Sequence, residues 1–414
     1  MLTQLTLAIT EENTLERSFH LDIFFNGEEI VRGRVLSSEQ SQDVRRVNHR
    51  YGNLFAQSYD PTIPVESQKD LGRTLFDIWL SEYWEIIKNR IPKGTLCIFL
   101  IASSSSDILN LPWELLFLPD SDFLGLNPKF SIRRMPHPVS CLPEFSGELR
   151  PKPLRLLFMA SSPTDLPELD YEAEEDALLE AISGLEVAFD SGDLGTFDNL
   201  RQKITEFKPH IVHLTGHGNI QNGQGMFVFE DETGKADARS SVDIQRILGG
   251  SGVQCVFISG CKSGRTPQIQ TMGGICQGLI GAEIPFTIGW AESIGDEEAI
   301  HFAQELYQVL AAGLSIDRAL YLARRSLWES CKTNDDPSWS LPVLYTSHTQ
   351  SEIVDPDSTR LLDIPQKISA EQKSLPGMIE GFAEHFVAGA EWTDARHHAA
   401  SMQSVRQVRR ADLL

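Results

Sequence analysis

The sequence is poor in cysteine and has no long hydrophobic run. Its six cysteines are scattered over 414 residues, without the dense spacing of a disulfide framework or the paired spacing of a zinc site. We interpret them as reduced thiols and expect no metal. The longest apolar runs, such as LCIFLIA at 96–102, are much shorter than the roughly 20 residues that span a bilayer, and the N-terminus lacks a signal-peptide pattern. We therefore expect a soluble, cytoplasmic protein with no membrane partner.

A concentrated basic face is also missing. The formal net charge is -22, while 41% of the residues are hydrophobic, so the acidity belongs to the surface of a globular protein and not to a disordered acidic chain. Phosphate binding needs clustered basic residues, which argues against nucleic acid as a partner. The expected strand at 154–160 is followed by SSPTDLPELD and not by a glycine-rich phosphate loop, so we expect no nucleotide and no other cofactor.

From residue 154 onward, apolar runs alternate with amphipathic segments of helical period. This alternation predicts βαβ units and an α/β fold, a doubly wound and mostly parallel six-stranded sheet with helices on both faces. The expected strands are 154–160, 185–190, 210–216, 253–260, 285–290 and 340–346. The expected helices are 171–182, with Asp170 as N-cap, 197–207, 241–248, 272–282, 296–313 and 315–330, and a hairpin is expected over 226–237.

Three regions are expected along the chain. Residues 1–147 predict a smaller N-terminal α+β subdomain, with a hairpin that turns at Asn26-Gly27 and a helix over 70–87. Residues 148–349 form the main α/β domain. Residues 350–414 are polar, broken by prolines and finally basic, which is typical of a linker followed by a disordered tail.

Two apolar segments end in residues that can do chemistry. IVHLTGHG at 211–218 delivers His217, and VFISGCKSG at 256–264 delivers Cys261. Side chains at the carboxyl ends of parallel strands stand at the edge where open α/β sheets bind their ligands. We therefore expect an imidazole and a thiol at one cleft, which is the arrangement of a cysteine hydrolase.

In that arrangement Cys261 is the nucleophile and His217 the general base and acid. The backbone N–H groups of Gly218 and Cys261 are the candidate oxyanion donors. Taken alone, a cysteine at a strand end is more often a small buried residue. The two residues follow separate strands about 45 residues apart, however, close to the roughly 50-residue offset known for caspases, and this favours the catalytic interpretation.

The sequence resembles the caspase-like clan of cysteine peptidases in two places. These are His217-Gly218 and Gly260-Cys261, which each follow an apolar block. More specifically, the chain resembles the CHAT domain family, which is related to separase. The resemblance covers about 70–346 and includes LPWELLF at 111–117, RLLFMASSPTDLPELDYEAEEDAL at 155–178, the segment 288–320 and PSWSLPVLY at 337–345. It implies a bacterial endopeptidase with a His217–Cys261 dyad, no obligatory third residue and no cofactor, which acts on protein or peptide substrates.

The resemblance also implies a peptidase that is latent until a partner or signal activates it. Segment 377–387 resembles the lead-in to an ATPase module, so a regulatory sensor or NTPase protein is an expected partner. The alternative function is a catalytically silent, caspase-like interaction module in a signalling or defence assembly. Replacement of Cys261 by alanine separates the two, because only cleavage needs the thiol.

The pattern departs from caspases next to the nucleophile. Cys261 follows Ser259-Gly260 and not Gln-Ala, so aspartate specificity does not carry over and the preference for the residue before the cleaved bond stays open. Glu292 and Asp296 are candidate residues of a substrate pocket, and the alternative is that they are solvated acids. For Trp113 and Glu114 we expect a structural role, with Glu114 paired to Arg133 or Arg134.

Overall fold

The structure is a computed structural model. It describes residues 2–12, 18–56, 63–119, 121–167, 169–221, 224–260, 268–280, 284–292, 294–330 and 335–355. The chain divides into two compact units, residues 1–360 and 361–414, and all of the described residues lie in the first. The predictions for Cys261 and for the tail after residue 355 lie outside the described residues.

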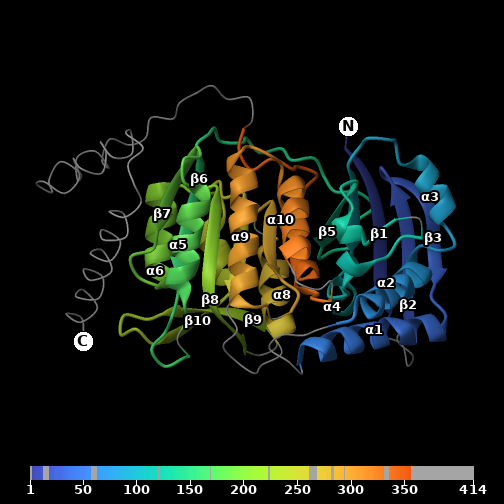
Figure 1. The fold of residues 1–414 in the computed structure, drawn as a ribbon, viewed down its shortest axis with the longest axis horizontal. Helices are drawn as coiled ribbons and strands as arrows, with labels where there is room; N and C mark the ends of the chain where they lie inside the picture. Colours follow the sequence, from blue (N-terminus) through green and yellow to red (C-terminus); the bar gives the residue numbers. More distant parts are fainter. Residues whose placement is uncertain are drawn as a thin grey trace, which may run out of the picture. The chain divides into compact units, whose positions relative to one another are not determined.

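The centre of the first unit is a mostly parallel β-sheet (Figure 1). Strands β7, β6, β8, β11 and β12 are hydrogen-bonded in that order and all run parallel, whereas β13 lies antiparallel to β12. Their bounds are β6 Leu154–Ala160, β7 Val187–Ser191, β8 Ile211–Gln221, β11 Cys255–Gly260, β12 Phe286–Trp290 and β13 Pro342–Thr346. The six predicted strands and their mostly parallel arrangement are therefore confirmed, but they are part of a larger, 13-stranded sheet.

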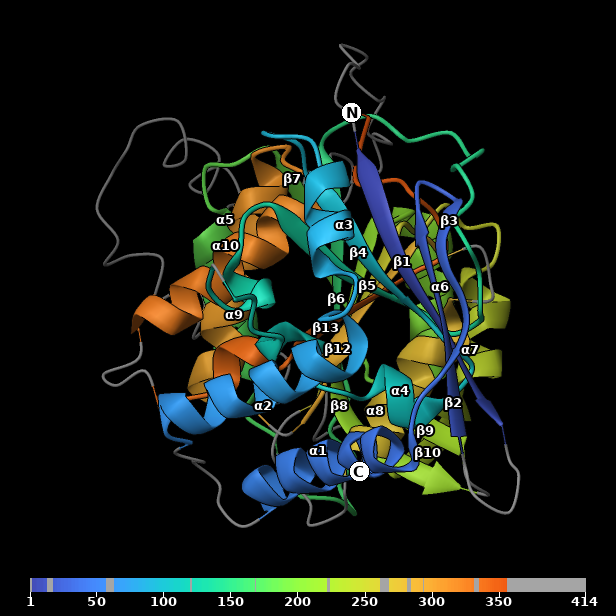
Figure 2. The ribbon, with the colours of Figure 1, turned by 90° about the vertical axis from the view of Figure 1, so that its right-hand side faces the viewer.

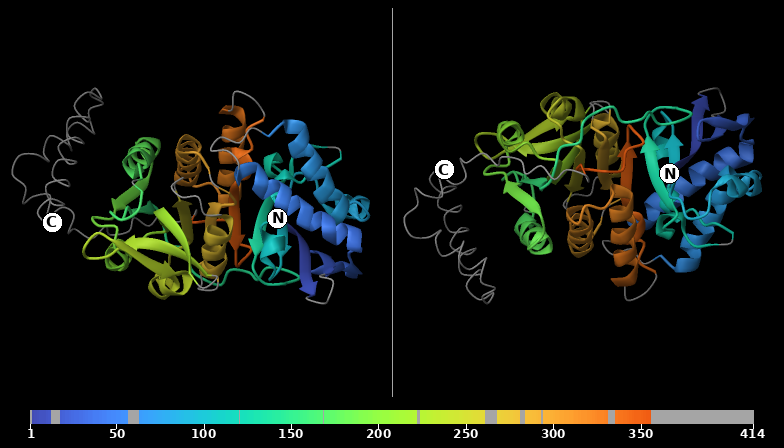
Figure 3. Two further views of the ribbon diagram at one scale, coloured as in Figure 1. Left: turned by 90° about the horizontal axis from the view of Figure 1, so that it is seen from below. Right: turned by 90° about the horizontal axis from the view of Figure 1, so that it is seen from above.

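Helices cover both faces of this sheet, as predicted (Figures 2 and 3). One face carries α5 (Tyr171–Ile182), α9 (Asp296–Ala311) and α10 (Ile316–Ser330), and the other carries α6 (Phe197–Phe207), α7 (Ser241–Leu248) and α8 (Gln268–Leu279). The predicted N-cap of α5 is confirmed, because the Asp170 carboxylate accepts a hydrogen bond from the backbone N–H of Ala173 at 3.4 Å.

The strand β8 is longer than predicted. Its second half leaves the parallel sheet and forms an antiparallel hairpin with β9 (Gln224–Glu230), which then pairs with β10 (Ala236–Ser240). β8 leaves the parallel ladder at Gly216, where the backbone lies too close to the Phe227 ring to allow a side chain. An added Cβ would be 2.7 Å from that ring. The hairpin expected over 226–237 is confirmed.

The N-terminal region continues the same sheet through β5, β4, β1, β2 and β3. The predicted turn at Asn26-Gly27 is confirmed, since both residues have positive φ, 51° and 80°. The elements are β1 Thr3–Glu12, β2 Ser18–Phe25, β3 Glu28–Val35, α1 Ser38–Ala56, α2 Val65–Trp79, α3 Trp84–Arg90, β4 Cys97–Ala102, α4 Ser106–Leu109 and β5 Phe130–Met135, and the short 3₁₀ turns are η1 Trp113–Leu115, η2 Leu124–Leu126 and η3 Ser338–Ser340.

The helix predicted over 70–87 is wrong in extent, because α2 ends at Trp79 and α3 begins at Trp84. At the break the helical hydrogen bonds give way to turn contacts, since Ser81 N–H donates to the carbonyl of Phe76 at 3.0 Å and Tyr83 N–H to that of Leu80 at 2.9 Å. Within the described ranges, no helix is both long and apolar enough to cross a membrane.

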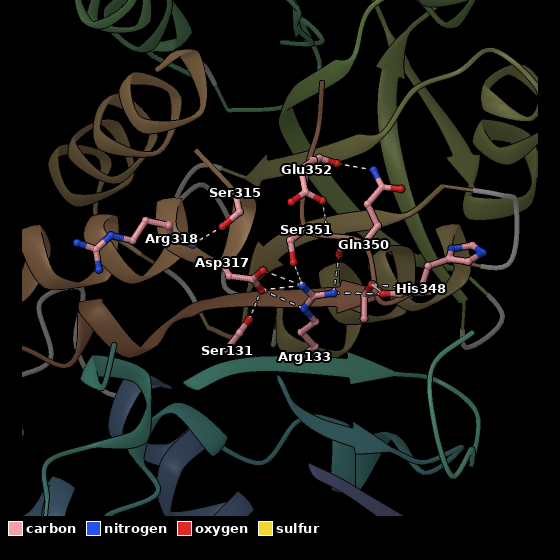
Figure 4. A network of polar contacts seen from close by, with 10 residues as sticks. Ser131, Arg133, Ser315, Asp317, Arg318, His348, Gln350, Ser351 and Glu352 are labelled. Carbon is pink, nitrogen blue, oxygen red and sulfur yellow. Dashed lines mark hydrogen bonds and ion pairs between the residues drawn. The ribbon is translucent and has the colours of Figure 1, made fainter. Parts of the chain in front are cut away.

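The seam between the two halves of the sheet has a very short backbone ladder. Strands β13 and β5 share one residue pair, Tyr345 with Arg134. Beside it, the Arg133 guanidinium donates to both carboxylate oxygens of Asp317 on α10 at 2.8 Å (Figure 4). Arg133 also donates to the carbonyls of His348 and Gln350. The domain boundary at residue 148 stays a prediction. The sheet contains strands from both sides of this residue.

Arg134 makes the second buried ion pair at the seam. Its guanidinium donates to Glu114 of η1 at 2.7 and 2.8 Å, and Arg324 of α10 contacts the same carboxylate at 3.3 Å. The predicted pairing of Glu114 is therefore confirmed, with Arg134 as its partner. Trp113 is also fully buried and its indole N–H donates to the carbonyl of Ile108 at 2.8 Å.

Candidate active site

His217 lies in β8 just beyond the point where the parallel ladder ends. Its side chain is 6% exposed, and Nε2 is 2.9 Å from the backbone carbonyl oxygen of Pro167. A carbonyl only accepts hydrogen bonds, so Nε2 carries a proton. In the neutral ring Nδ1 then holds the lone pair, which makes Nδ1 the nitrogen that can accept a proton. The loop that precedes α5 thus orients the imidazole.

Burial lowers the pKa of His217 below its usual value, and the hydrogen bond to Pro167 partly opposes that shift. The sign follows from desolvation, which disfavours the charged imidazolium. The imidazole is consequently a neutral base over the physiological range, in the state that accepts a proton.

The ladder between β8 and β11 places the segment before Cys261 next to the segment before His217. Cys255 stands opposite Ile211, and the register continues without a shift to Gly260 opposite Gly216. His217 is the next residue after Gly216, and Cys261 is the next after Gly260 in the sequence. The last described pair therefore leads directly to the two predicted catalytic residues.

Glu292 follows the neighbouring strand. The β11–β12 ladder ends at the pair Phe257 and Ile288, and Glu292 is two residues beyond Trp290, the last residue of β12. Its side chain is 7% exposed, and its Oε1 has no hydrogen-bond partner among the described residues. Burial raises the pKa of the Glu292 carboxyl to about 9, so at neutral pH this acid is protonated.

Asp296 is in a different environment. It is exposed in the first turn of α9, where a carboxylate interacts favourably with the helix dipole. The two predicted pocket acids therefore differ, because Glu292 is buried at the strand end and Asp296 is exposed at the start of a helix.

Gly218, the predicted oxyanion donor, pairs with Phe227 of β9 along one edge of β8.

The sequence analysis missed two groups that contact histidines of β8. One is the Pro167 carbonyl, which gives no side-chain signal. The other is Glu174 on α5, which is buried against His213 of β8, with Oε1 3.1 Å from Nε2. Glu174 shares a helix face with Leu178 and Ile182, and this apolar spacing was a signal that predicts its burial.

A metal is not part of the described site. No group of three or more His, Cys, Asp or Glu side chains in the described ranges is placed to hold a metal ion. The described part of the site supplies an oriented imidazole, one residue beyond the last pair of the β8–β11 ladder.

Comparison with known protein families identifies the family of this chain. The CHAT domain family model matches residues 69–355, well over half of the chain. The chain belongs to the CHAT domain family. No curated protein matches the sequence.

Similar solved structures include peptidases. Separase of Saccharomyces cerevisiae, solved with securin, is 13% identical with a TM-score of 0.43, and the match covers 83% of this chain and 30% of that one. The Arg-specific cysteine proteinase gingipain R is 8% identical with a TM-score of 0.39, and 76% of each chain is covered. The complex of the pro- and mature domains of Porphyromonas gingivalis RgpB is 9% identical, with a TM-score of 0.39 and coverage of 77% and 79%. The chain thus spans less than a third of the separase that it matches.

Proposed function

We propose that this CHAT domain protein is a cysteine endopeptidase in which His217 and Cys261 hydrolyse peptide bonds of protein substrates. The observation that carries the proposal is the unshifted β8–β11 register up to Gly216 and Gly260. Adjacent parallel strands lie about 4.8 Å apart, and each catalytic residue is one peptide bond beyond this last pair. The oriented imidazole of His217 adds support.

The reaction follows from the protonation state of His217. Nδ1 takes the proton of the Cys261 thiol, because Nε2 already donates to Pro167. The thiolate attacks the peptide carbonyl carbon, and the N–H groups of Gly218 and Cys261 are proposed to stabilise the oxyanion. The imidazolium then protonates the leaving amine as the C–N bond breaks and leaves a thioester. Water, deprotonated by His217, attacks the thioester and releases the carboxylic acid and the thiol.

The proposed substrate pocket includes Glu292 and, at its outer side, Asp296. Glu292 is protonated because its burial makes ionisation of the carboxyl costly. A cationic side chain that enters beside it offsets this cost, so that the carboxyl can ionise and form an ion pair with it. The exposed Asp296 would contribute a solvent-screened attraction only. A basic residue before the cleaved bond is the substrate feature that these two acids support best.

Regulation is proposed as a second part of this function. We propose a cytoplasmic peptidase that is latent until a protein partner or a signal, such as a sensor or NTPase protein, activates it. The resemblance of segment 377–387 to an ATPase lead-in supports this partner class. A purified chain would then need that partner to reach full activity.

The test compares wild type with Cys261→Ala, His217→Ala and the control Cys141→Ala, which removes an exposed thiol outside the site. Each protein is incubated with a denatured proteome and with the products of neighbouring genes, and new termini are mapped by mass spectrometry. We expect new termini with wild type and with Cys141→Ala, and none with the other two. Cleavage that persists in Cys261→Ala contradicts the proposal, and partner binding without any cleavage favours the silent interaction module.

A further inference from the structure

An open cavity lies at the edge of the sheet opposite to His217. Strand β13 runs antiparallel to β12, so the chain after β13 lies at the edge where β11 and β12 begin. His217 instead follows the carboxyl end of the β8–β11 ladder. Residues of segment 349–355 line the cavity together with Leu2 and residues of segment 144–149, and its volume is about 630 Å³. Sites for organic ligands have volumes of roughly 300 to 1,000 Å³.

The charged wall of the cavity is acidic. Its charged side chains are Glu144, Glu148, Glu352 and Asp355, and no basic side chain of the described residues lines it. The three glutamates are exposed. These carboxylates are spread too widely to bind a metal ion, since no group of three or more His, Cys, Asp or Glu side chains in the described ranges is placed to hold one. They suit an organic cation that reaches more than one of them.

Two neighbouring arginines are engaged elsewhere. Arg150, which follows segment 144–149, donates to the backbone carbonyls of Pro209 and Gly252. Arg133 is paired with the carboxylate of Asp317 at 2.8 Å. The acidic wall therefore keeps a negative charge that an entering cation can offset.

Gln350 supplies a buried polar group in the wall of the cavity. The residue is 8% exposed, and its Nε2 group donates to the side-chain oxygen of Gln254 at 3.3 Å and to the carbonyl of Glu352. These two acceptors fix the orientation of the amide. Its Oε1 then has no hydrogen-bond partner in the part of the chain that the structure describes. A buried acceptor without a donor costs free energy, so a donor that enters beside Gln350 is stabilised there.

The wall around Gln350 is fixed by contacts within the protein (Figure 4). Arg133 of β5 donates to the backbone carbonyl of Gln350 and to the hydroxyl of Ser351, both at 2.8 Å. The pairing of Arg133 with Asp317 of α10 holds this guanidinium in place. A preformed wall lowers the cost of ordering side chains when a ligand binds.

Apolar side chains also line the cavity, and they are Leu2, Phe145 and Leu149. The Phe145 ring meets the imidazole of His348 edge to face, with ring centroids 5.5 Å apart. Gly147 leaves room for the Phe145 ring, because an added Cβ there would clash with it. An aromatic ring attracts a cation, and apolar surface covers an alkyl stem. The cavity therefore has the groups that recognise an arginine or lysine side chain.

We propose that this cavity binds a basic segment of a protein partner, with an arginine side chain inside it. A guanidinium group carries five donors and no acceptor, which matches the glutamate carboxylates and Oε1 of Gln350. The formal net charge of -22 favours the approach of a basic partner. The proposal does not depend on the peptidase reaction, because His217 lies at the other edge of the sheet.

The test measures the binding of a defined basic probe to the full chain. A fluorescein-labelled peptide of alternating arginine and glycine is titrated with the protein at about 150 mM salt, and fluorescence anisotropy gives Kd. A peptide with citrulline in place of arginine keeps the shape and removes the charge. The matched control, Glu172→Gln/Glu180→Gln, removes two exposed charges from α5. The cavity variants are Glu144→Gln/Glu148→Gln, Gln350→Met and Phe145→Leu.

We expect saturable binding of the arginine peptide and no binding of the citrulline peptide. Glu144→Gln/Glu148→Gln should raise Kd by roughly 3- to 10-fold, since two screened charge contacts are lost. Gln350→Met should raise Kd by roughly 5- to 20-fold, because a hydrogen bond to a charged donor is lost. Phe145→Leu should raise it by roughly 2- to 5-fold. The control variant should change Kd by less than about 2-fold.

Three results would overturn the proposal. The first is the absence of saturable binding of the arginine peptide. The second is an equal rise of Kd in the two double glutamate variants, because the peptide would then bind the acidic surface as a whole. The third is displacement by spermidine that is as effective, at equal charge, as displacement by unlabelled peptide, because the site would then take a free polyamine. Thermal melting checks that each variant folds, and the exposed Glu144 and Glu148 decide the test if Gln350→Met does not fold.

Discussion

Nε2 of His217 donates a hydrogen bond to the backbone carbonyl of Pro167 at 2.9 Å. This contact assigns the proton of the neutral imidazole to Nε2 and leaves Nδ1 as the basic nitrogen. In the proposed reaction no third catalytic side chain is needed, because the carbonyl of a loop residue orients the imidazole. The proposal therefore makes the conformation of that loop important for activity.

The first prediction concerns this loop. Pro167 is exposed, so Pro167→Ala keeps the carbonyl and should retain nearly all activity. Pro167→Gly frees the backbone and should lower kcat by about 5-fold, since the imidazole loses its fixed orientation. Nitrogen chemical shifts of His217 should show the proton on Nε2 in wild type. A predominant Nδ1-protonated form would contradict the assignment.

The second prediction concerns the buried acid Glu292. Its folded-state pKa of about 9 lies above the ordinary value of 4.5, so the folded protein binds the proton more tightly than the unfolded chain. Stability from this group is fully present below about pH 4.5 and falls as the pH rises toward 9. Glu292→Gln, which cannot ionise, should be more stable than wild type at pH 8, by roughly 2 to 4 kcal/mol, and similar at pH 4.5.

Denaturant unfolding at the two pH values measures this difference. Asp296→Asn is the matched control, because that acid is exposed and should show no comparable pH-dependent gain. Equal stability changes for Glu292→Gln at both pH values would show that Glu292 is not desolvated in the folded state.

The third prediction concerns the charges at the seam. Glu114→Gln leaves the guanidinium groups of Arg134 and Arg324 buried without their counter-charge. Loss of one partner of a buried ion pair costs about 3 to 5 kcal/mol. Glu66→Gln removes an exposed ion pair with Lys69 and should cost much less, because solvent screens exposed charges. Urea unfolding compares them, and similar values for the two variants would refute the prediction.

The fourth prediction concerns the end of the parallel ladder. An added Cβ at Gly216 would stand 2.7 Å from the Phe227 ring, and 3.2 Å from the carbonyl oxygen of Ser161. Gly216→Ala should therefore displace β8 next to His217, with a loss of about 1 to 3 kcal/mol and a fall in kcat. Gly274→Ala meets nothing closer than 3.5 Å and lies in a helix, so it should be neutral or stabilising. Thermal melting and peptide cleavage give the two readouts.

Much of the fold could be predicted from local pattern. The strands from 154 to 346 are short apolar runs, and α5 has a clear N-cap in Asp170, so both could be predicted from residue types alone. Non-local features were harder to find. The seam between β5 and β13 joins segments about 210 residues apart through one pair, and no local pattern encodes that contact. The break between α2 and α3 could not be predicted either, because the apolar spacing of Phe76, Leu80 and Trp84 fits one continuous helix.

The candidate site likewise has features that the local sequence pattern predicts and features that it does not. The place of His217 just beyond the parallel ladder could be predicted from the apolar run before it, since Gly216 aligns with Gly260 as two parallel strands require. Its catalytic role stays a proposal. The Pro167 carbonyl could not be predicted, since every residue has one and only the loop conformation aims it. Glu174 was overlooked among several acids of one helix, although its spacing to Leu178 and Ile182 indicated a buried face.

The ion pairs of Arg133 and Arg134 also decide how the molecule can be shortened for experiments. A fragment that starts at residue 148 would retain Asp317 and Arg324 but lose Arg133, Arg134 and Glu114. Asp317 and Arg324 would then lack their ion-pair partners, on a surface that the missing N-terminal half no longer covers. Workable expression fragments should therefore begin at the N-terminus, or carry neutral replacements at both positions.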